Sequence, residues 1–317
     1  MHFPPELGVE VAVCPWPSEG LWRRLKNILF ARTRRGDLNH ITGDVHYLAM
    51  ALPQRNTVLT IHDLGFLLQP NPVLRTILFW FWLKMPVAKS KVVTTISEAT
   101  KRDILRYLPG CPPDKIRVIP NPLLPFFHPV PKSFDPVFPT VLLVGTKPNK
   151  NLPRQLAALE SIPCRIVVNG EKKRELESLF RQHRLPFTWL EHLSADELLQ
   201  AYAQSDLLLF ASTLEGFGMP ILEAQAVGRP VITSNCSSMP EVAGEGACLV
   251  DPFDVAAIRE GVLKVIGDAE YRETLVRNGH ENVKRFEAKE VARRYSELYA
   301  SIFSQNPIPP ISPSGGN

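Results

Sequence analysis

The amino-acid sequence predicts an α/β protein with two domains, each built on a parallel β-sheet with helices on both faces. Short apolar runs of strand type alternate with helical segments in both halves of the chain, and this alternation is typical of parallel sheets with crossover helices. A proline-rich stretch interrupts it between residues 120 and 139. The chain has 317 residues, which is ample for two domains of ordinary size.

The first half contains five predicted strands and three predicted helices. The helix over residues 21–35 is amphipathic and basic, and the helix over 72–90 is apolar. Ser97 is expected to cap the third helix, because its hydroxyl can accept a backbone N–H at the helix start. The predicted strands cover 9–14, 38–42, 57–61, 92–96 and 116–119, and the predicted helices cover 21–35, 72–90 and 98–108.

The second half restarts this pattern after a linker. Residues 120–139 hold seven prolines, a density that cannot continue a helix or a central strand. We therefore predict domains over 1–132 and 133–303, and a disordered tail over 304–317 that is rich in Pro, Ser and Gly. The predicted strands cover 141–144, 165–168, 187–190, 206–212, a segment opened by Pro230, and 248–250; the predicted helices cover 152–159, 172–183, 196–204, 219–227 and three segments between 255 and 303.

Composition favours a cytoplasmic protein. No run approaches the roughly 20 apolar residues of a membrane-spanning helix, and the first 13 residues lack the basic start of a signal peptide. The five cysteines are widely spaced and form no C-x-x-C pair, so we interpret them as reduced core residues.

The net charge of +4 is unevenly distributed. Residues 1–132 carry 17 Lys and Arg against 9 Asp and Glu, whereas 133–317 carry 19 against 23. The basic half indicates an anionic partner, such as the inner face of a membrane or a phosphate-bearing acceptor, although solvated helix faces account for part of the excess. Residues 79–82 contribute aromatic side chains to this predicted surface, and the alternative is that these side chains fill the core. The residues expected at the surface are Trp22, Arg23, Arg24, Lys26, Arg32, Arg34, Arg35 and 79–82.

Residues 206–235 are predicted to form a strand, a glycine loop, a helix and a further strand. The loop holds Glu215, and Gly216 and Gly218 let the backbone approach a ligand closely. Unpaired N–H groups at the start of the following helix favour an anion such as phosphate. Glu223 lies eight residues after Glu215, so both carboxylates can face one crevice and accept hydrogen bonds from vicinal hydroxyls. An anion site beside two hydroxyl acceptors predicts a nucleotide-sugar site.

The segment E-G-F-G-M-P-I-L-E resembles the E-x7-E signature of retaining glycosyltransferases with the GT-B fold, of the group 1 or family 4 type. The resemblance covers nearly the whole chain and implies two Rossmann-like, doubly wound domains that face a cleft. It implies that Glu223 holds the nucleotide ribose and that Glu215 contacts the donor sugar. The backbone lining the sugar phosphate would be that of Gly216, Phe217, Gly218 and Met219.

A second loop, V-G-T-K-P-N-K-N-L, follows the first strand of the second domain. A glycine turn and a lysine near a helix start suit a pyrophosphate, and Lys150 would neutralise charge on the departing group. A solvated loop lysine is the alternative. The loop resembles the family's G-x-(n)-R-K-N-L motif at Lys150 and Asn151, with Gly145 at its turn.

This second match is incomplete, because Thr146 and Asn149 stand where many relatives carry an arginine. One cation is therefore present where two are usual, unless Lys147 substitutes. The next strand of the domain ends at Asn169 and Gly170, which either border the nucleotide or form a plain turn.

In the first domain, T-I-H-D at residues 60–63 ends a predicted strand, and we expect His62 to point into the cleft. The motif is similar to the family's H-D motif, which implies that His62 contacts the donor sugar. Asp63 either orients this histidine or caps the next turn. The alternative is a structural histidine with satisfied hydrogen bonds.

The resemblance implies transfer of a hexose from a UDP- or GDP-sugar to a hydroxyl of a saccharide or lipid-linked acceptor, with retention, in polysaccharide or glycolipid assembly. Glu215, Lys150 and His62 would form the catalytic set, with no metal, no further cofactor and no nucleic-acid partner. The sequence has no D-x-D pair for a metal-bridged donor. Two alternatives stay open: a non-catalytic sugar-nucleotide-binding subunit, and a nucleotide-sugar 2-epimerase of the same fold.

The start of the chain departs from the family's pattern. Such first domains open with a strand, a glycine-rich turn and a helix, whereas the strand predicted over 9–14 matches the family's second by its spacing to T-I-H-D. We therefore expect that a βα unit of roughly 30 residues is missing. The first-domain sheet would then lack a strand beside 9–14, with the true start upstream. A weakened fragment is the alternative.

Overall fold

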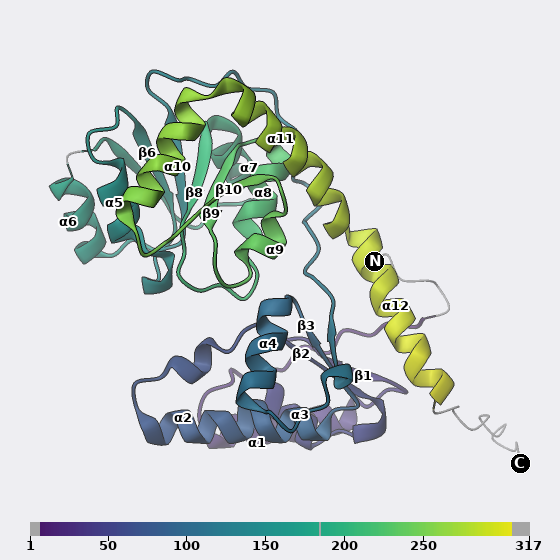
Figure 1. The fold of residues 1–317 in the computed structure, drawn as a ribbon. Helices are drawn as coiled ribbons and strands as arrows, with labels where there is room; N and C mark the ends of the chain where they lie inside the picture. The colour runs from purple at the N-terminus through teal and green to yellow at the C-terminus, as the bar shows by residue number, and fades with distance from the viewer. Residues whose placement is uncertain (1–6, 184, 306–317) are drawn as a thin grey trace, which may run out of the picture. The chain divides into compact units, whose positions relative to one another are not determined.

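The computed structural model describes residues 7–183 and 185–305 and shows an α/β protein (Figure 1). The chain forms two compact units. The first comprises the described residues of 1–96, 100–119 and 291–317, and the second comprises 97–99 and the described residues of 120–290. Each unit has its own parallel sheet, which confirms the predicted fold class.

The sheet of the first unit has four parallel strands in the order β1-β2-β3-β4. Its central strand β2 is buried along its whole length, as an apolar strand between two helical layers must be. The helices α2 and α3 are joined by a π-helical turn, Phe79–Lys84, so the segment predicted as one helix is a helix with a local bulge. The strands are β1 (Asn39–Ile41), β2 (Thr57–Ile61), β3 (Val92–Thr95) and β4 (Ile116–Val118), and the helices are α1 (Leu21–Thr33), α2 (Pro72–Leu78), α3 (Met85–Lys89) and α4 (Glu98–Tyr107).

The last helix, α12 (Ala288–Gln305), packs on this first sheet from residue 291 onward. Its apolar side forms a cluster with Val58 of β2. The Tyr299 hydroxyl lies 2.6 Å from Nδ1 of His40, whose Nε2 lies 2.7 Å from the Thr60 hydroxyl. A polar chain inside an apolar contact therefore fixes the helix in one position on the sheet.

The prediction of a strand over residues 9–14 is wrong. The segment is irregular and pairs with no strand among the described residues, and Val9, Val11 and Val13 are exposed. Alternating apolar residues indicate β propensity, but a strand also needs a neighbouring backbone to bond to. The expectation of a missing βα unit rests on this strand, so it loses its support.

The second sheet has six parallel strands in the order β10-β9-β8-β5-β6-β7. The chain runs outward from β5 to β7, returns to β8 beside β5, and then runs to the opposite edge, so the strand order reverses between β5 and β8. Helices α5, α6 and α10 cover one face around an apolar core, while α7 packs against β5 and α8 against β8. In such sheets ligands bind at the carboxyl ends of the strands where the order reverses.

Where the sequence analysis set both bounds of an element in the second unit, the observed bounds lie within two residues of them. The helix α9 was not predicted, because five residues give no periodic signal. The strands are β5 (Thr140–Val144), β6 (Arg165–Asn169), β7 (Phe187–Leu190), β8 (Leu207–Phe210), β9 (Val231–Ser234) and β10 (Ala247–Val250). The helices are α5 (Leu152–Leu159), α6 (Arg174–Gln182), α7 (Ala195–Gln204), α8 (Met219–Val227), α9 (Met239–Ala243), α10 (Val255–Gly267) and α11 (Ala269–Val283).

Residues 120–139 contain neither helix nor strand, as their proline density predicted. The units nevertheless divide the chain differently from the predicted ranges 1–132 and 133–303, because α12 packs on the first sheet. From residue 306 onward, the predicted tail lies outside the described residues.

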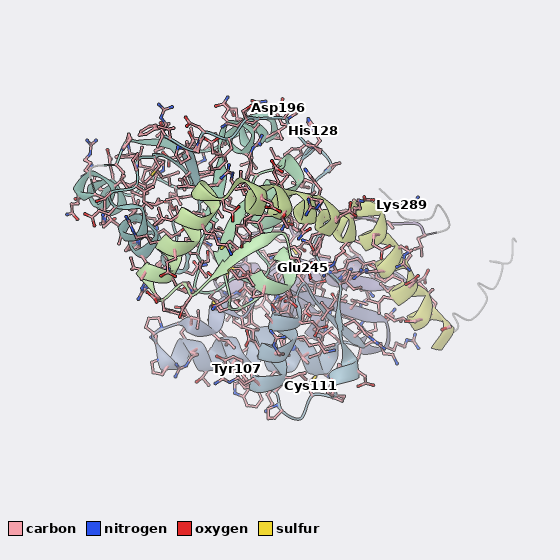
Figure 2. The ribbon with its side chains drawn as sticks, turned by 45° about the horizontal axis from the view of Figure 1, so that its top comes forward. Tyr107, Cys111, His128, Asp196, Glu245 and Lys289 are labelled. Atoms are coloured by element: carbon pink, nitrogen blue, oxygen red, sulfur yellow. The ribbon has the colours of Figure 1, made fainter. Side chains whose placement is uncertain are left out.

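The five cysteines are free thiols, and Cys164 and Cys248 are buried in the core. Cys14, Cys236 and Cys111, which Figure 2 labels near Tyr107, are only half-buried. Among the described helices, none combines the length and apolar character needed to cross a bilayer.

Candidate functional site

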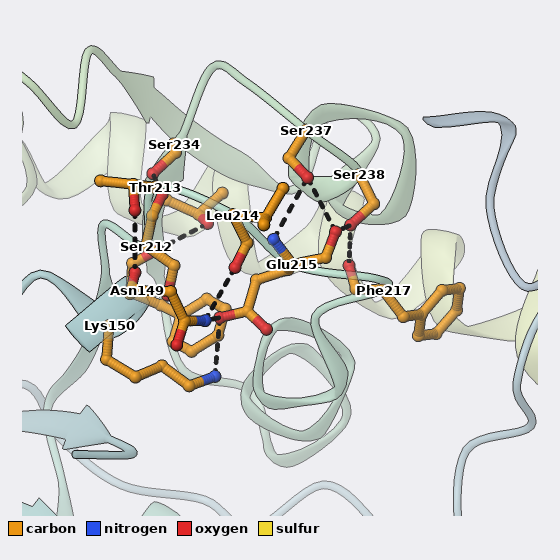
Figure 3. Close-up of polar contacts among 12 residues, drawn as sticks. Asn149, Lys150, Ser212, Thr213, Leu214, Glu215, Phe217, Ser234, Ser237 and Ser238 are labelled. Carbon is orange, nitrogen blue, oxygen red and sulfur yellow. Dashed lines mark hydrogen bonds and ion pairs between the residues drawn. The ribbon is translucent and has the colours of Figure 1, made fainter. Parts of the chain in front are cut away.

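The loops that follow β5 and β8 meet at the reversal of the strand order (Figure 3). The first loop carries Lys150 and the second carries Glu215. Because parallel strands place their carboxyl ends at one edge, two segments 65 residues apart in sequence come into contact here.

Lys150 is held as a fixed cation in the second unit. Its Nζ donates to Oε1 of Glu215 at 2.6 Å (Figure 3) and lies 4.6 Å from the centre of the Phe210 ring. Gly145 permits this position, because it has a φ of +92° and a Cβ atom there would lie 2.6 Å from Cε of the lysine. The two charged side chains are only 16% and 13% exposed. This shielding strengthens the attraction of the lysine for a phosphate.

The loop that carries Glu215 is held by side chains of two other loops (Figure 3). Asn149 donates from Nδ2 to the preceding carbonyl at 2.8 Å and to Glu215 Oε1 at 3.4 Å. The Ser237 hydroxyl donates to the Glu215 carbonyl at 2.7 Å and accepts the Glu215 N–H at 3.2 Å. The buried Ser238 hydroxyl lies 2.9 Å from the same carbonyl and 2.7 Å from that of Phe217. The backbone around the carboxylate is therefore rigid.

Glu223 lies on α8, and its carboxylate is held from α7. Its Oε2 accepts a hydrogen bond from the Tyr202 hydroxyl at 2.5 Å. Burial raises the pKa of Glu223, whereas the Tyr202 hydroxyl and the positive charge of Lys150 oppose that rise. Lys150 thus acts on both motif carboxylates, by contact on Glu215 and through space on Glu223.

The loop between the two glutamates presents backbone rather than side chains. Gly218 has a φ of +113° as the residue before α8, and no side chain caps that helix end. The Phe217 ring is buried and packs edge-on against Phe286. Met219 begins the helix, and Gly216 precedes the buried ring. Amide donation by these four residues to a phosphate stays a prediction.

The glycine turns after β5 and β6 are in contact. The N–H of Gly145 donates to the carbonyl of Asn169 at 2.7 Å. A Cβ atom on Gly170 would lie 2.9 Å from Cγ2 of Thr146. This close packing explains why glycines stand at both positions. A border with the nucleotide stays a prediction for Asn169 and Gly170.

Asn151 has a different role from the predicted one. It adopts a φ of +59° and is buried. Its Nδ2 donates to the carbonyls of Ala211 at 3.0 Å and Pro252 at 2.7 Å. Because both amide hydrogens are used inside the unit, this side chain holds the lysine loop and has no free donor for a substrate.

His62 belongs to the first unit, at the carboxyl end of β2. Its Nε2 lies 2.7 Å from the carbonyl of Thr42, so one ring nitrogen is occupied within the unit. Asp63 accepts the N–H of Gly65 at 2.7 Å and therefore caps the next turn, which is one of its two predicted roles. Contact between His62 and a donor sugar stays a prediction.

Three residues of the site were not predicted. Ser237 and Ser238 follow β9, and their signal was their position after a buried strand beside the reversal point. Tyr202 carries no such signal, because a tyrosine in an amphipathic helix reads as an ordinary core residue.

Two family models match the chain. One, described as glycosyl transferases group 1, matches residues 135–282. The other, described as glycosyltransferase family 4, matches residues 5–123. Between them they cover both sheets and the loops of Lys150, Glu215 and His62.

Curated relatives include two enzymes of O-antigen synthesis. O-antigen chain mannosyltransferase B of Escherichia coli is 28% identical over 262 residues, which are 74% of this chain and 68% of the relative. O-antigen chain mannosyltransferase RfbU of Salmonella typhimurium is 30% identical over 208 residues, 63% of this chain and 58% of the relative. The match with the second relative thus spans less than two thirds of its length.

Solved structures share the fold. Sucrose-phosphate synthase from Thermosynechococcus elongatus superposes with a TM-score of 0.77 at 20% identity, over 90% of this chain and 79% of that one. Anabaena HepE, solved in complex with UDP and glucose, gives a TM-score of 0.72 at 18% identity, over 88% and 81%. Both likenesses support the two-domain GT-B fold.

Proposed function

Because this chain belongs to the group 1 glycosyltransferases, we propose that it moves a hexose from a UDP- or GDP-sugar to an acceptor hydroxyl with retention of configuration. The observation that carries the proposal is the contact of Lys150 with Glu215 at the reversal of the strand order, where the charge of Lys150 also acts on Glu223. One cation and two carboxylates at this edge suit a diphosphate flanked by two sets of vicinal hydroxyls.

Each charged group has a distinct task in this proposal. The bond between the anomeric carbon and the diphosphate breaks, and Lys150 stabilises the charge that develops on the departing phosphate. The hydrogen bonds from Asn149 and Lys150 to the Glu215 carboxylate both end on Oε1, which in the described part of the chain leaves Oε2 for a sugar hydroxyl. Glu223 accepts the ribose hydroxyls, and contact of His62 with the donor sugar stays a prediction.

The acceptor oxygen forms the new bond on the face that the phosphate leaves, and its proton passes to the departing phosphate oxygen. No protein nucleophile is required, and this geometry retains the anomeric configuration.

Lys150 supplies the positive charge that a metal ion supplies in other transferases, so EDTA should leave the rate of transfer unchanged.

The relatives narrow the choice of sugar and product. Two of them are named as O-antigen mannosyltransferases, so we propose a mannosyl donor as the first to test. We also propose that the acceptor is a saccharide, free or lipid-linked, of a surface polysaccharide.

The test is a donor screen. UDP- and GDP-hexoses are each incubated with a saccharide acceptor mixture, released UDP or GDP is measured, and the new linkage is assigned by NMR. We expect release with one donor, and a product whose anomeric configuration equals that of the donor. An inverted product refutes retention, an epimerised donor without transfer favours the epimerase, and binding without any turnover favours a non-catalytic subunit.

We further propose that the first unit contacts an anionic lipid surface through an α1 patch, defined as Leu21, Trp22, Leu25 and Leu29. These four side chains are exposed on successive turns of α1, with Trp22 at 78%. Exposed cations accompany them on α1 and just after it, namely Arg23, Lys26, Arg32, Arg34 and Arg35. Apolar side chains flanked by cations suit the boundary between acyl chains and anionic headgroups.

Two residues predicted for this surface have other tasks. Trp82 is buried and its indole N–H donates to Asp44 at 2.8 Å. Arg24 lies over the Trp82 ring at 4.5 Å from its centre, so it supports the core. Trp80 and Phe81 are exposed and stay candidates.

Sedimentation with phosphatidylglycerol and phosphatidylcholine vesicles tests the α1 patch. We expect binding to the anionic vesicles that weakens with salt and is lost in Trp22→Ser/Leu29→Ser, while Val137→Ser, which removes another exposed apolar side chain, changes nothing. No preference for the anionic lipid at low or high salt removes the proposal. A dimer in solution that the double variant abolishes would instead assign the patch to a second copy.

A further inference from the structure

The carboxylate of Glu223 depends on a single side chain of another helix for its position. Tyr202 is fully buried on α7 and donates its hydroxyl hydrogen to Oε2 of Glu223 at 2.5 Å. A hydrogen bond from a neutral hydroxyl to a carboxylate is short and strong in such surroundings. It occupies one carboxylate oxygen and leaves the other for a ligand.

The tyrosine is itself held from two sides. The Phe127 ring packs edge-on against it, with the ring centres 5.7 Å apart. The buried guanidinium of Arg229 donates to the carbonyls of Tyr202 at 3.2 Å and Ala203 at 3.1 Å, which fixes the end of α7. A side chain held in this way cannot follow a displaced carboxylate, so it defines where the carboxylate must lie.

The pKa shifts of Tyr202 and Glu223 agree with a hydrogen bond in which the tyrosine donates and the carboxylate accepts. Burial, and then the adjacent Glu223 carboxylate, raise the pKa of Tyr202 well above its usual range, so the phenol keeps its hydrogen. Burial also raises the pKa of Glu223, and the two groups that oppose this rise are Tyr202 from α7 and Lys150 from the loop after β5. Without the hydroxyl, the charged form of Glu223 loses one of its two supports.

We propose that Tyr202 is a positioning residue for donor binding, whose hydroxyl holds the Glu223 carboxylate in the orientation that accepts the ribose hydroxyls of the nucleotide. This inference rests on the proposed function, because it assumes that Glu223 binds ribose. It adds to that function a residue outside the E-x7-E motif, on a different helix.

The test is titration of UDP and GDP into the wild type and Tyr202→Phe by calorimetry between pH 5 and 8. The variant keeps the ring that Phe127 contacts and loses only the hydroxyl. We expect binding of the preferred nucleotide to weaken about tenfold at pH 7, the loss of one hydrogen bond to a charged group. The affinity for the nucleotide falls as Glu223 gains a proton. Because the variant lacks the hydroxyl that supports the charged form of Glu223, this fall should begin at a higher pH than in the wild type.

Two further variants separate positioning from packing. Tyr271→Phe removes a hydroxyl that lies near Cys248 elsewhere in the same unit, and should change neither the affinity nor its pH dependence. In a Glu223→Gln background, Tyr202→Phe should weaken binding less than it weakens the wild type, because the two residues act as one.

An unchanged affinity and pH profile in Tyr202→Phe overturns the inference while the proposed function stands. Equal weakening in the wild-type and Glu223→Gln backgrounds also overturns it, since the tyrosine would then act through packing alone. A wild type that binds neither UDP nor GDP overturns the proposed function and this inference together.

Discussion

Replacing Gly145 by alanine should disable Lys150 without touching its chemistry. The new Cβ atom would lie 2.6 Å from Cε, 2.9 Å from Cγ and 3.0 Å from Cδ of the lysine. The backbone is fixed by the bond from the Gly145 N–H to the Asn169 carbonyl at 2.7 Å. The flexible lysine is therefore the partner that moves, and its 2.6 Å contact with Glu215 is lost.

Two effects set the size of the loss. A non-glycine residue at a φ of +92° costs about 1–3 kcal/mol of strain. A hydrogen bond between charged groups contributes about 1.5–3 kcal/mol, and the pair here is mostly shielded from solvent. Donor binding and turnover need the lysine in place in this account. The loss of the hydrogen bond between Lys150 and Glu215, about 1.5–3 kcal/mol, then corresponds to a fall of about 10- to 100-fold in kcat/KM.

The assay combines denaturant unfolding with donor kinetics in Gly145→Ala, Lys150→Ala and the double variant. The matched control is Gly267→Ala, because Gly267 ends α10 and has open space where the methyl group would lie. We expect Gly145→Ala to reduce kcat/KM strongly in the wild type and little in the Lys150→Ala background. Full activity in Gly145→Ala, or an equal fall in both backgrounds, refutes the reasoning.

Three further outcomes are expected. Glu223→Ala should mainly raise the donor KM and Glu215→Ala should mainly lower kcat; equal effects on both parameters in steady-state kinetics would count against this division of roles. Ser238→Ala should lower the unfolding free energy by about 1–3 kcal/mol, because the carbonyls of Glu215 and Phe217 lose a buried donor; an unchanged denaturation midpoint would contradict this. Burial, reinforced by the neighbouring His62 charge, lowers the pKa of His40 to about 4. Because its pKa is lower when folded than when unfolded, His40 should cost stability as pH falls from about 6.5 to 4, by about 3 kcal/mol. His40→Asn should remove that part of the pH dependence. If the unfolding free energies of the wild type and the variant change in parallel between pH 6.5 and 4, this prediction is disproved.

The sequence predicted the elements of the second unit well, because its strands are short apolar runs bounded by glycine or proline and its helices carry clear stops such as Gly228. The resemblance also named Lys150 and Glu215 as members of one catalytic set, and the structure shows their loops in contact because both follow central strands of one parallel sheet.

Other features depend on contacts that no local pattern records. The amphipathic pattern of α12 predicts a helix but does not specify which sheet it covers. The segment 9–14 has the composition of a strand and lacks a partner among the described residues. The bond from Tyr202 to Glu223 joins two helices through their side chains, and only the packing of the unit brings them together.

The central claim is that Lys150, Glu215 and Glu223 form the donor site. A crystal structure with bound UDP or GDP tests it most directly, with the Lys150→Ala variant titrated in parallel. We expect the diphosphate within hydrogen-bond distance of Lys150 Nζ and of the backbone after Gly216, the ribose hydroxyls on Glu223, and weaker binding in the variant. A nucleotide that occupies another part of the chain, or one that binds the variant as tightly as the wild type, would contradict the claim.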